Sequence, residues 1–271
     1  MGDTLITIGD GCRIAYRFDG PPDAPVLLLS NSLGTDLDMW APQMDAWTQR
    51  FRVLRYDQRG HGQSDAPTGA YSMDRLGRDV IELLDALDLE TVNFCGLSLG
   101  GMVGQWLAVH APRRLAKLIL ANTSAYMGPP SGWQARIEGV LVDGMAPLTE
   151  ASLFRWFTPS FLTTSPEAVA MIRKMLLAND PIGYAGCCAA IRDMDQRPTA
   201  MLNRTPTLVI AGSQDAATSV AEAEFLIQSA KQGRLTVLPA AHLSNVELAQ
   251  RFSDIVVDFL QPAHLDNPAF E

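Results

Sequence analysis

Two patterns of apolar residues alternate along the first half of the chain. Short continuous runs, such as residues 25–30 with the letters PVLLLS, are typical of strands buried on both faces of a sheet. Residues 74–88 instead carry leucine and valine at every third or fourth position, which predicts an amphipathic helix with Ser72 as its N-cap. Further strands are expected at 4–8, 13–18, 52–56, 91–95 and 117–121, and a further helix at 99–110. This alternation predicts the α/β class, with a mostly parallel, twisted sheet flanked by helices.

The alternation is interrupted once. Residues 126–203 show helical stretches and no clear strand, and prolines at 129–130 and 181 break the pattern. The pattern of strand and helix returns afterwards, at 207–211, 221–230, 235–238 and 245–260. We therefore expect one α/β core formed by residues 1–125 and 204–271, with residues 126–203 as a helical insertion.

Composition and charge limit the kinds of molecule that the protein is expected to bind. The chain has 271 residues, of which 47 % are hydrophobic and 19 % charged, and this globular composition excludes intrinsic disorder. Acidic residues exceed basic ones by 30 to 21, giving a net charge of −9 without any cluster of five basic residues. Nucleic acid and anionic membranes are therefore not expected as partners. No apolar run reaches the ~18 residues of a membrane span. A small-molecule substrate is expected, and the oligomeric state stays open.

The four cysteines, Cys12, Cys95, Cys187 and Cys188, match neither a disulfide framework nor a metal site of the CxxC kind. Reduced thiols are expected. The N-terminus lacks the basic and apolar regions of a secretory signal, so a cytoplasmic location is expected.

A candidate nucleophile lies between the predicted strand at 91–95 and the predicted helix at 99–110. The spacing Gly96-x-Ser98-x-Gly100 fits a sharp strand-to-helix turn, in which glycine avoids the collisions that a Cβ atom would cause. Such a turn exposes the serine hydroxyl above the sheet. The alternative is an ordinary turn rich in small residues.

A serine hydroxyl needs a base to accept its proton. The chain has four histidines, and His242 follows the last predicted strand, where a base would lie over the strand ends; His61, His110 and His264 lie elsewhere. An acid partner would orient the imidazole. Asp215 follows the strand at 207–211, whereas the end of the strand at 117–121 carries Asn122 and Thr123 and no carboxylate. Because the other strand end has no carboxylate, Asp215 is favoured as the acid partner of His242.

Five segments resemble the 3-oxoadipate enol-lactonases of the α/β-hydrolase superfamily, and the resemblance extends over essentially the whole chain. These segments are SNSLGTD at 30–36, VLRYD at 53–57 with RGHG at 59–62, FCGLSLGG at 94–101, RWFT at 155–158 and AHLSNVE at 241–247. The superfamily places the acid before the histidine in chain order, as Asp215 and His242 are here. One departure follows Asp215, where the family usually has Thr-Pro-Pro and this chain has AATSV at 216–220.

The resemblance implies a mechanism for a small unsaturated lactone that carries a carboxylate, in the breakdown of aromatic compounds. Ser98 would attack the lactone carbonyl, and His242 would take its proton. The backbone N–H groups of Ser32 and Leu99 would form the oxyanion hole. The same resemblance implies that the reaction needs no metal and no organic cofactor.

The resemblance also implies that the helical insertion is a cap over the site. A carboxylate in a dry pocket needs a charged partner such as arginine. Trp133 and Arg136 are three residues apart, on one face of a helix, and they resemble the family's cap residues that face the substrate; Arg155 and Trp156 are the second choice. The alternative is that Trp133 is core and Arg136 is solvated.

Three other functions stay open at this stage. A broad carboxylesterase or lactonase would need the same nucleophile, base and acid. A C–C bond hydrolase of meta-cleavage products would also use serine, histidine and aspartate. A ligand-binding receptor could use the same scaffold without turnover. Only the cap distinguishes the enzymes from one another.

Overall fold

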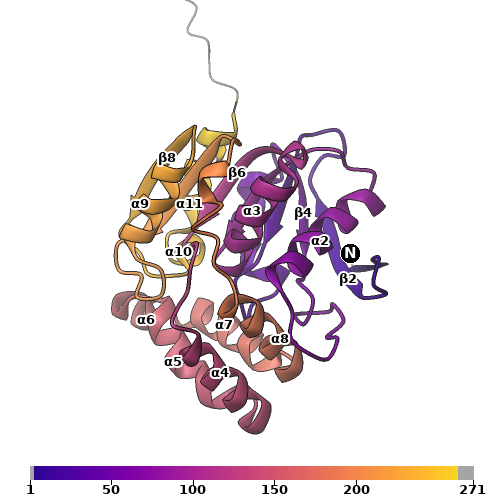
Figure 1. Cartoon of the computed structure of the whole chain (residues 1–271). Helices are drawn as coiled ribbons and strands as arrows, with labels where there is room; N and C mark the ends of the chain where they lie inside the picture. Colours follow the sequence, from indigo (N-terminus) through magenta and orange to yellow (C-terminus); the bar gives the residue numbers. More distant parts are fainter. Residues whose placement is uncertain (1–2, 262–271) are drawn as a thin grey trace, which may run out of the picture.

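The structure is a computed structural model that describes residues 3–261. Eight strands form one sheet in the order β1-β2-β4-β3-β5-β6-β7-β8 (Figure 1). β1 and β2 are antiparallel to their neighbours, and every pairing from β4 to β8 is parallel. The strands are β1 (Thr4–Thr7), β2 (Arg13–Asp19), β3 (Val26–Ser30), β4 (Arg52–Tyr56), β5 (Val92–Leu97), β6 (Leu115–Ala121), β7 (Thr207–Gly212) and β8 (Gly233–Leu238).

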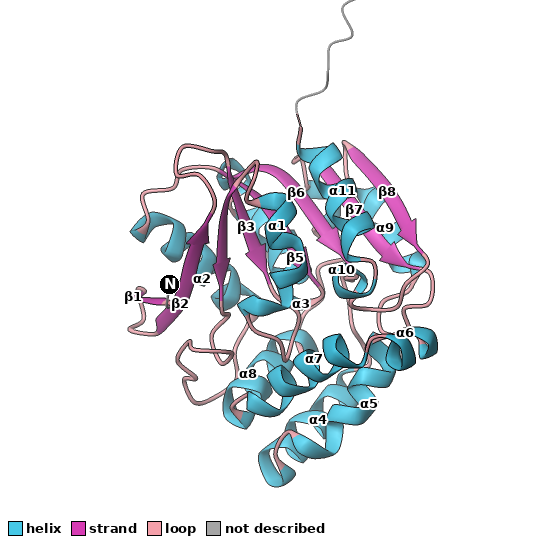
Figure 2. Cartoon of the chain, turned by 180° about the vertical axis from the view of Figure 1, so that it is seen from behind, coloured by secondary structure: helices cyan, strands magenta, loops and turns pink. Residues whose placement is uncertain are grey.

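The core lies on both faces of this sheet. Leu27, Leu28 and Leu29 of β3 are fully buried, as a continuous apolar run requires of a central strand. Helices α2 and α3 pack together on one face, and α1 and α11 pack together on the other (Figure 2). The helices of the core are α1 (Met44–Trp47), α2 (Met73–Ala86), α3 (Leu99–His110), α9 (Val220–Ser229), α10 (Ser244–Glu247) and α11 (Ala249–Leu260), with short 3₁₀ helices at Leu37–Gln43, Pro112–Arg114 and Ala200–Leu202.

The predicted fold class is confirmed, and most predicted elements begin and end within two residues of the observed ones. Ser72 caps α2 by accepting a hydrogen bond from the Arg75 N–H at 3.1 Å. The helix predicted at 245–260 is wrong in one respect, because it is divided in two. Leu248, at φ −125° and ψ 51°, leaves the helical region and separates α10 from α11.

Five helices lie together beyond the carboxyl ends of the strands (Figure 1). They are α4 (Pro130–Asp143), α5 (Ala146–Trp156), α6 (Pro159–Thr164), α7 (Pro166–Ala178) and α8 (Pro181–Arg192). The prolines that break the sequence pattern begin helices, because proline lacks only an N–H group that the first turn leaves unused. The division of the chain at 126 and 203 stays a prediction.

No helix among residues 3–261 has the length and apolar character needed to cross a membrane. All four cysteines are buried and free.

Candidate active site

Ser98 lies at the sharp turn between β5 and α3. Its backbone has φ 57° and ψ −114°, a region that residues other than glycine rarely occupy. The Ser98 N–H donates to the Ala121 carbonyl at 2.9 Å, which ties the turn to β6. A Cβ atom on Gly96 would lie 2.2 Å from the Gly100 carbonyl oxygen, and one on Gly100 would lie 2.1 Å from that of Ser30. The turn therefore needs glycine on both sides of the serine.

The His242 imidazole is bound to Asp215 at the carboxyl ends of β7 and β8. His242 Nδ1 and Asp215 Oδ2 are 2.8 Å apart, and both side chains are buried. Thr218 donates to the same carboxylate through its hydroxyl at 2.7 Å and its N–H at 3.0 Å. Burial alone would raise the pKa of Asp215, but His242 and the hydrogen bonds from Asn122 and Thr218 outweigh it and hold that pKa below its ordinary value. Asp215 is thus an anion that orients the imidazole.

Asn122 is a residue of this site that the sequence reasoning missed. Its Nδ2 donates to Asp215 Oδ2 at 3.0 Å and to the Ala241 carbonyl at 3.2 Å, while its Oδ1 accepts from the Ser244 hydroxyl at 2.5 Å. Its φ is 44°, which asparagine tolerates better than most residues. Asn122 therefore connects the acid to both sides of the His242 loop. Its position at the end of β6 was visible in the sequence, but its partners lie about 90 to 120 residues away along the chain.

Two backbone N–H groups close to Ser98 are the predicted oxyanion donors. They belong to Leu99, the first residue of α3, and to Ser32, which follows β3. Among the described residues, neither N–H donates to another protein group. Asn31 fixes the spacing between the two segments, because its carbonyl accepts from the Gly100 N–H at 2.9 Å. This arrangement can bind a negatively charged oxygen.

His61 supports the loop that carries Ser32. Its Nε2 accepts a hydrogen bond from the Gly34 N–H at 2.8 Å, and Gly34 has φ +82°. Burial lowers the pKa of His61 to about 4, so the ring is neutral and can accept this bond at neutral pH. Asn179 donates to the Gly34 carbonyl at 2.8 Å from the helical insertion. His61 thus acts on the loop and does not line the cavity described below.

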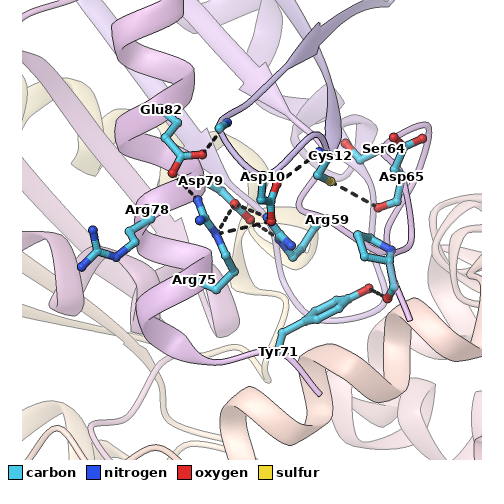
Figure 3. A network of polar contacts seen from close by, with 12 residues as sticks. Asp10, Cys12, Arg59, Ser64, Asp65, Tyr71, Arg75, Arg78, Asp79 and Glu82 are labelled. Carbon is cyan, nitrogen blue, oxygen red and sulfur yellow. Dashed lines mark hydrogen bonds and ion pairs between the residues drawn. The ribbon is translucent and has the colours of Figure 1, made fainter. Parts of the chain in front are cut away.

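The segment that carries His61 is held by a buried ionic network (Figure 3). The Arg59 guanidinium binds both oxygens of Asp79 on α2 at 2.5 Å and one oxygen of Asp10 at 2.8 Å. Arg75 joins the same Asp79 at 3.0 Å. Burial of such charges is tolerated because each is paired and hydrogen-bonded. The network is a structural support for the loop and lies apart from the reactive groups.

One cavity of about 160 Å³ brings most of the predicted site residues together. Its lining consists of Ser32, Leu33, Ser98, Met102, Met127, Trp133, Arg136, Arg155, Trp156, Ile191, Ala217 and His242. The core supplies the serine and the imidazole, and α4 and α5 supply the two arginines and two tryptophans. Asp215 lies behind His242. Among the described side chains, no hydrogen bond joins the Ser98 hydroxyl to the imidazole.

Among residues 3–261, the two arginines of this cavity have no acidic partner. Arg136 donates to the Tyr184 hydroxyl at 3.2 Å and lies 5.0 Å from the centre of the Trp133 ring, and Arg155 donates to Ser152 at 3.3 Å. Neither forms an ion pair with a carboxylate in the described part of the chain. Burial lowers the pKa of Arg155, and the charge of Arg136 lowers it further. Two adjacent positive charges in a small cavity favour an anionic ligand.

Within residues 3–261, no group of three or more His, Cys, Asp or Glu side chains is placed to hold a metal ion.

The chain resembles known hydrolases in both sequence and structure. Residues 25–247 match the α/β-hydrolase fold family. The chain is 45 % identical to 3-oxoadipate enol-lactonase 2 of Acinetobacter baylyi over 241 residues, covering 89 % of this chain and 90 % of that protein. A hydrolase from Pseudomonas aeruginosa has a similar structure, with a TM-score of 0.94, 48 % identity and coverage of 96 % and 98 % of the two chains. The enol-lactonase from Burkholderia xenovorans gives a TM-score of 0.93, 44 % identity and coverage of 95 % and 99 %.

Proposed function

The chain belongs to the α/β-hydrolase fold family, and from this premise we propose that it opens a small enol-lactone bearing a carboxylate, 3-oxoadipate enol-lactone, to give 3-oxoadipate. It is a hydrolase that acts on ester bonds. The relatives of high identity are named for this activity, and the similarity covers nearly their full lengths. Such a function places the enzyme in the breakdown of aromatic compounds.

The observation that carries the proposal is the pair of arginines to which the described part of the chain offers no acidic partner. The whole chain has a net charge of −9, which repels an anion, so binding of an anionic substrate needs a local positive site. Arg136 and Arg155 line the cavity that Ser98 and His242 also line. An esterase for neutral substrates gains nothing from two partly buried guanidinium groups that no carboxylate among the described residues pairs with, because removing such a charge from water costs free energy. We therefore assign the substrate carboxylate to this pair, with Trp133 and Trp156 as apolar walls.

The reaction we propose proceeds through an acyl-enzyme. Ser98 Oγ attacks the lactone carbonyl carbon, and His242 Nε2 takes the serine proton, since Nδ1 is occupied by Asp215. The N–H groups of Ser32 and Leu99 bind the oxyanion. The ring C–O bond then breaks, and the departing oxygen leaves as an enolate, which takes up the proton and becomes a ketone. Water activated by His242 hydrolyses the Ser98 ester and releases the second carboxylate.

The helical insertion, residues 126–203, acts in this proposal as a cap that excludes water and supplies the carboxylate site. Its helices α4 and α5 bring Arg136 and Arg155 over the strand ends. A dry cavity strengthens the attraction between the guanidinium groups and the substrate carboxylate. We also propose that the enzyme works in the cytoplasm, where the four buried thiols would stay reduced.

Quenching the reaction with acid tests the proposed function. In a lactone the leaving oxygen stays attached to the acyl group, so the Ser98 peptide should gain the mass of the intact substrate. An ordinary ester would leave only its acyl part. Mass spectrometry of the digested enzyme distinguishes the two results. The proposal is wrong if no adduct forms on the Ser98 peptide while the lactone is consumed, or if the lactone is not consumed at all.

A further inference from the structure

The loop that carries His242 is attached to the helical insertion directly on one side of the histidine and through Glu247 on the other. On one side, the Leu243 N–H donates to the Trp156 carbonyl at 3.0 Å. On the other, the Ala241 N–H donates to the Glu247 carboxylate at 3.0 Å. The residues flanking the imidazole are therefore held by groups that belong to, or contact, the end of α5. These contacts join the two segments RWFT and AHLSNVE, which are far apart in the sequence.

Glu247, the last residue of the short helix α10, connects this loop to Thr158. Its carboxylate accepts from the Thr158 hydroxyl and, at 3.4 Å, from the Thr158 N–H. Thr158 is in turn the N-cap of α6, and its Oγ1 accepts from the Phe161 N–H at 3.3 Å. Thr158 is buried and Glu247 is partly buried. The Glu247 carboxylate thus joins Ala241 of the His242 loop to Thr158 at the corner between α5 and α6. Figure 2 shows α10 and α6 as neighbours in the fold.

We propose that the Glu247–Thr158 pair is a positioning device that sets the orientation of His242 through the backbone of residues 241–243. It rests on the proposed function in one respect, namely that His242 is the base. Neither Glu247 nor Thr158 lines the cavity, so they act through the loop and not on the substrate. Hydrogen bonds to a charged group are stronger than neutral ones, which suits a contact that must hold a loop.

The same contacts fix the position of the base relative to the carboxylate site. Trp156 and Arg155, at the end of α5, line the cavity, and the Trp156 ring centre is 6.4 Å from that of His242. Helix α5, which would bind the substrate, is thus attached to the loop that carries the base through Trp156, Thr158 and Glu247. A small misplacement of a catalytic group lowers the rate strongly. Loosening this attachment should therefore reduce the chemical step more than substrate binding.

Variants of Thr158 distinguish the two roles of its hydroxyl, which donates to Glu247 and also caps helix α6. Thr158→Val removes both, Thr158→Ser keeps both, and Thr158→Gly removes the hydroxyl but keeps a residue type that N-cap positions favour. Thr163→Val is the matched control on α6, because the Thr163 hydroxyl is exposed and contacts only carbonyls of its own helix.

The readouts are the rate at which a small neutral phosphonate modifies Ser98, and kcat and KM for the lactone. We expect Val and Gly at position 158 to slow phosphonylation and kcat about tenfold, the cost of one hydrogen bond to a charged group, with KM changed less than about twofold. Ser at position 158 and Val at position 163 should remain within about twofold of the parent.

Parental rates in Thr158→Val would overturn the proposal. Recovery in Thr158→Gly would also overturn it, because the helix cap alone would then explain the effect, and so would a rise in KM with unchanged phosphonylation. Phosphonylation requires Ser98 and its base but no lactone. A parent that reacts with the phosphonate yet leaves the lactone intact would contradict the proposed function, and the comparison of the Thr158 variants would still decide the role of Glu247.

Discussion

Replacement of Arg136 by alanine tests how the enzyme recognises its substrate. Arg136 lines the cavity beside Trp133, and the described residues offer its guanidinium no carboxylate partner. We expect Arg136→Ala to lower kcat/KM for the carboxylate lactone, because one partner of a buried charge pair is lost. Losses of this kind are typically ~2–5 kcal/mol. The loss should remain in the lower part of this range, since Arg155 keeps one positive charge at the same cavity.

A loss of about 2–3 kcal/mol corresponds to a fall of about 30- to 150-fold in kcat/KM. The assay compares initial rates for the lactone and for its carboxamide, which has nearly the same shape and no charge. The carboxamide should show almost no difference between parent and variant. Arg136→Lys should recover only part of the loss, because a point charge cannot reproduce a two-pronged contact.

Arg173→Ala is the matched control for charge. It removes one positive charge from the same group of helices, but Arg173 is exposed and paired with Glu150 at 2.7 Å. This variant should behave like the parent on both substrates, since exposed pairs contribute little. An equal loss on both substrates in Arg136→Ala would indicate a disturbed cap. No loss on either would remove Arg136 from the substrate site and transfer the role to Arg155.

Three further predictions concern the core of the site. Ser98→Ala should keep its circular dichroism spectrum and lose about 10⁴-fold or more in kcat, and an active variant would contradict the assignment of the nucleophile. Asp215→Asn should lower kcat by about 10³- to 10⁴-fold without unfolding, because the imidazole loses its orienting anion; a fully active variant would point to another acid. Burial lowers the pKa of His61 from 6.5 to about 4, so the unfolded chain binds more protons in this window. The contribution of His61 to the free energy of unfolding should be complete above pH 6.5 and fall by about 2 kcal/mol on acidification to pH 5. Urea unfolding of the parent against His61→Gln at pH 7.5 and pH 5 measures this fall, and a constant difference between them would refute it.

The core of the fold was predictable because its signals are local. β3 and β5 are short apolar runs, and the turn at Ser98 follows from glycines two residues away on either side. His242 and Asp215 follow strand ends, which meet at one edge of a parallel sheet. The structure places these residues as that reasoning expects, although their catalytic roles stay predictions.

The contacts that complete the site were not predictable, because they join residues far apart in the chain. Asn122 bonds to Ser244, and Thr158 bonds to Glu247 across 89 residues. The division between α10 and α11 was missed for a related reason, since apolar spacing continues through Leu248 while its backbone leaves the helix. The packing of α4 against α8, which brings Arg136 to Tyr184, depends on tertiary contacts that periodicity does not record.

The ratio of kcat/KM for the carboxylate lactone to kcat/KM for its carboxamide, measured with the parent enzyme, tests the central claim most directly. A panel that adds a simple phenyl acetate and a meta-cleavage product tests the two alternative functions, broad esterase and C–C bond hydrolase, in the same experiment. Recognition of the carboxylate by Arg136 and Arg155 predicts a ratio of about 30 or more, with the lactone the best substrate of the panel. A ratio near one, or a higher kcat/KM for the phenyl acetate or the meta-cleavage product, would contradict the account.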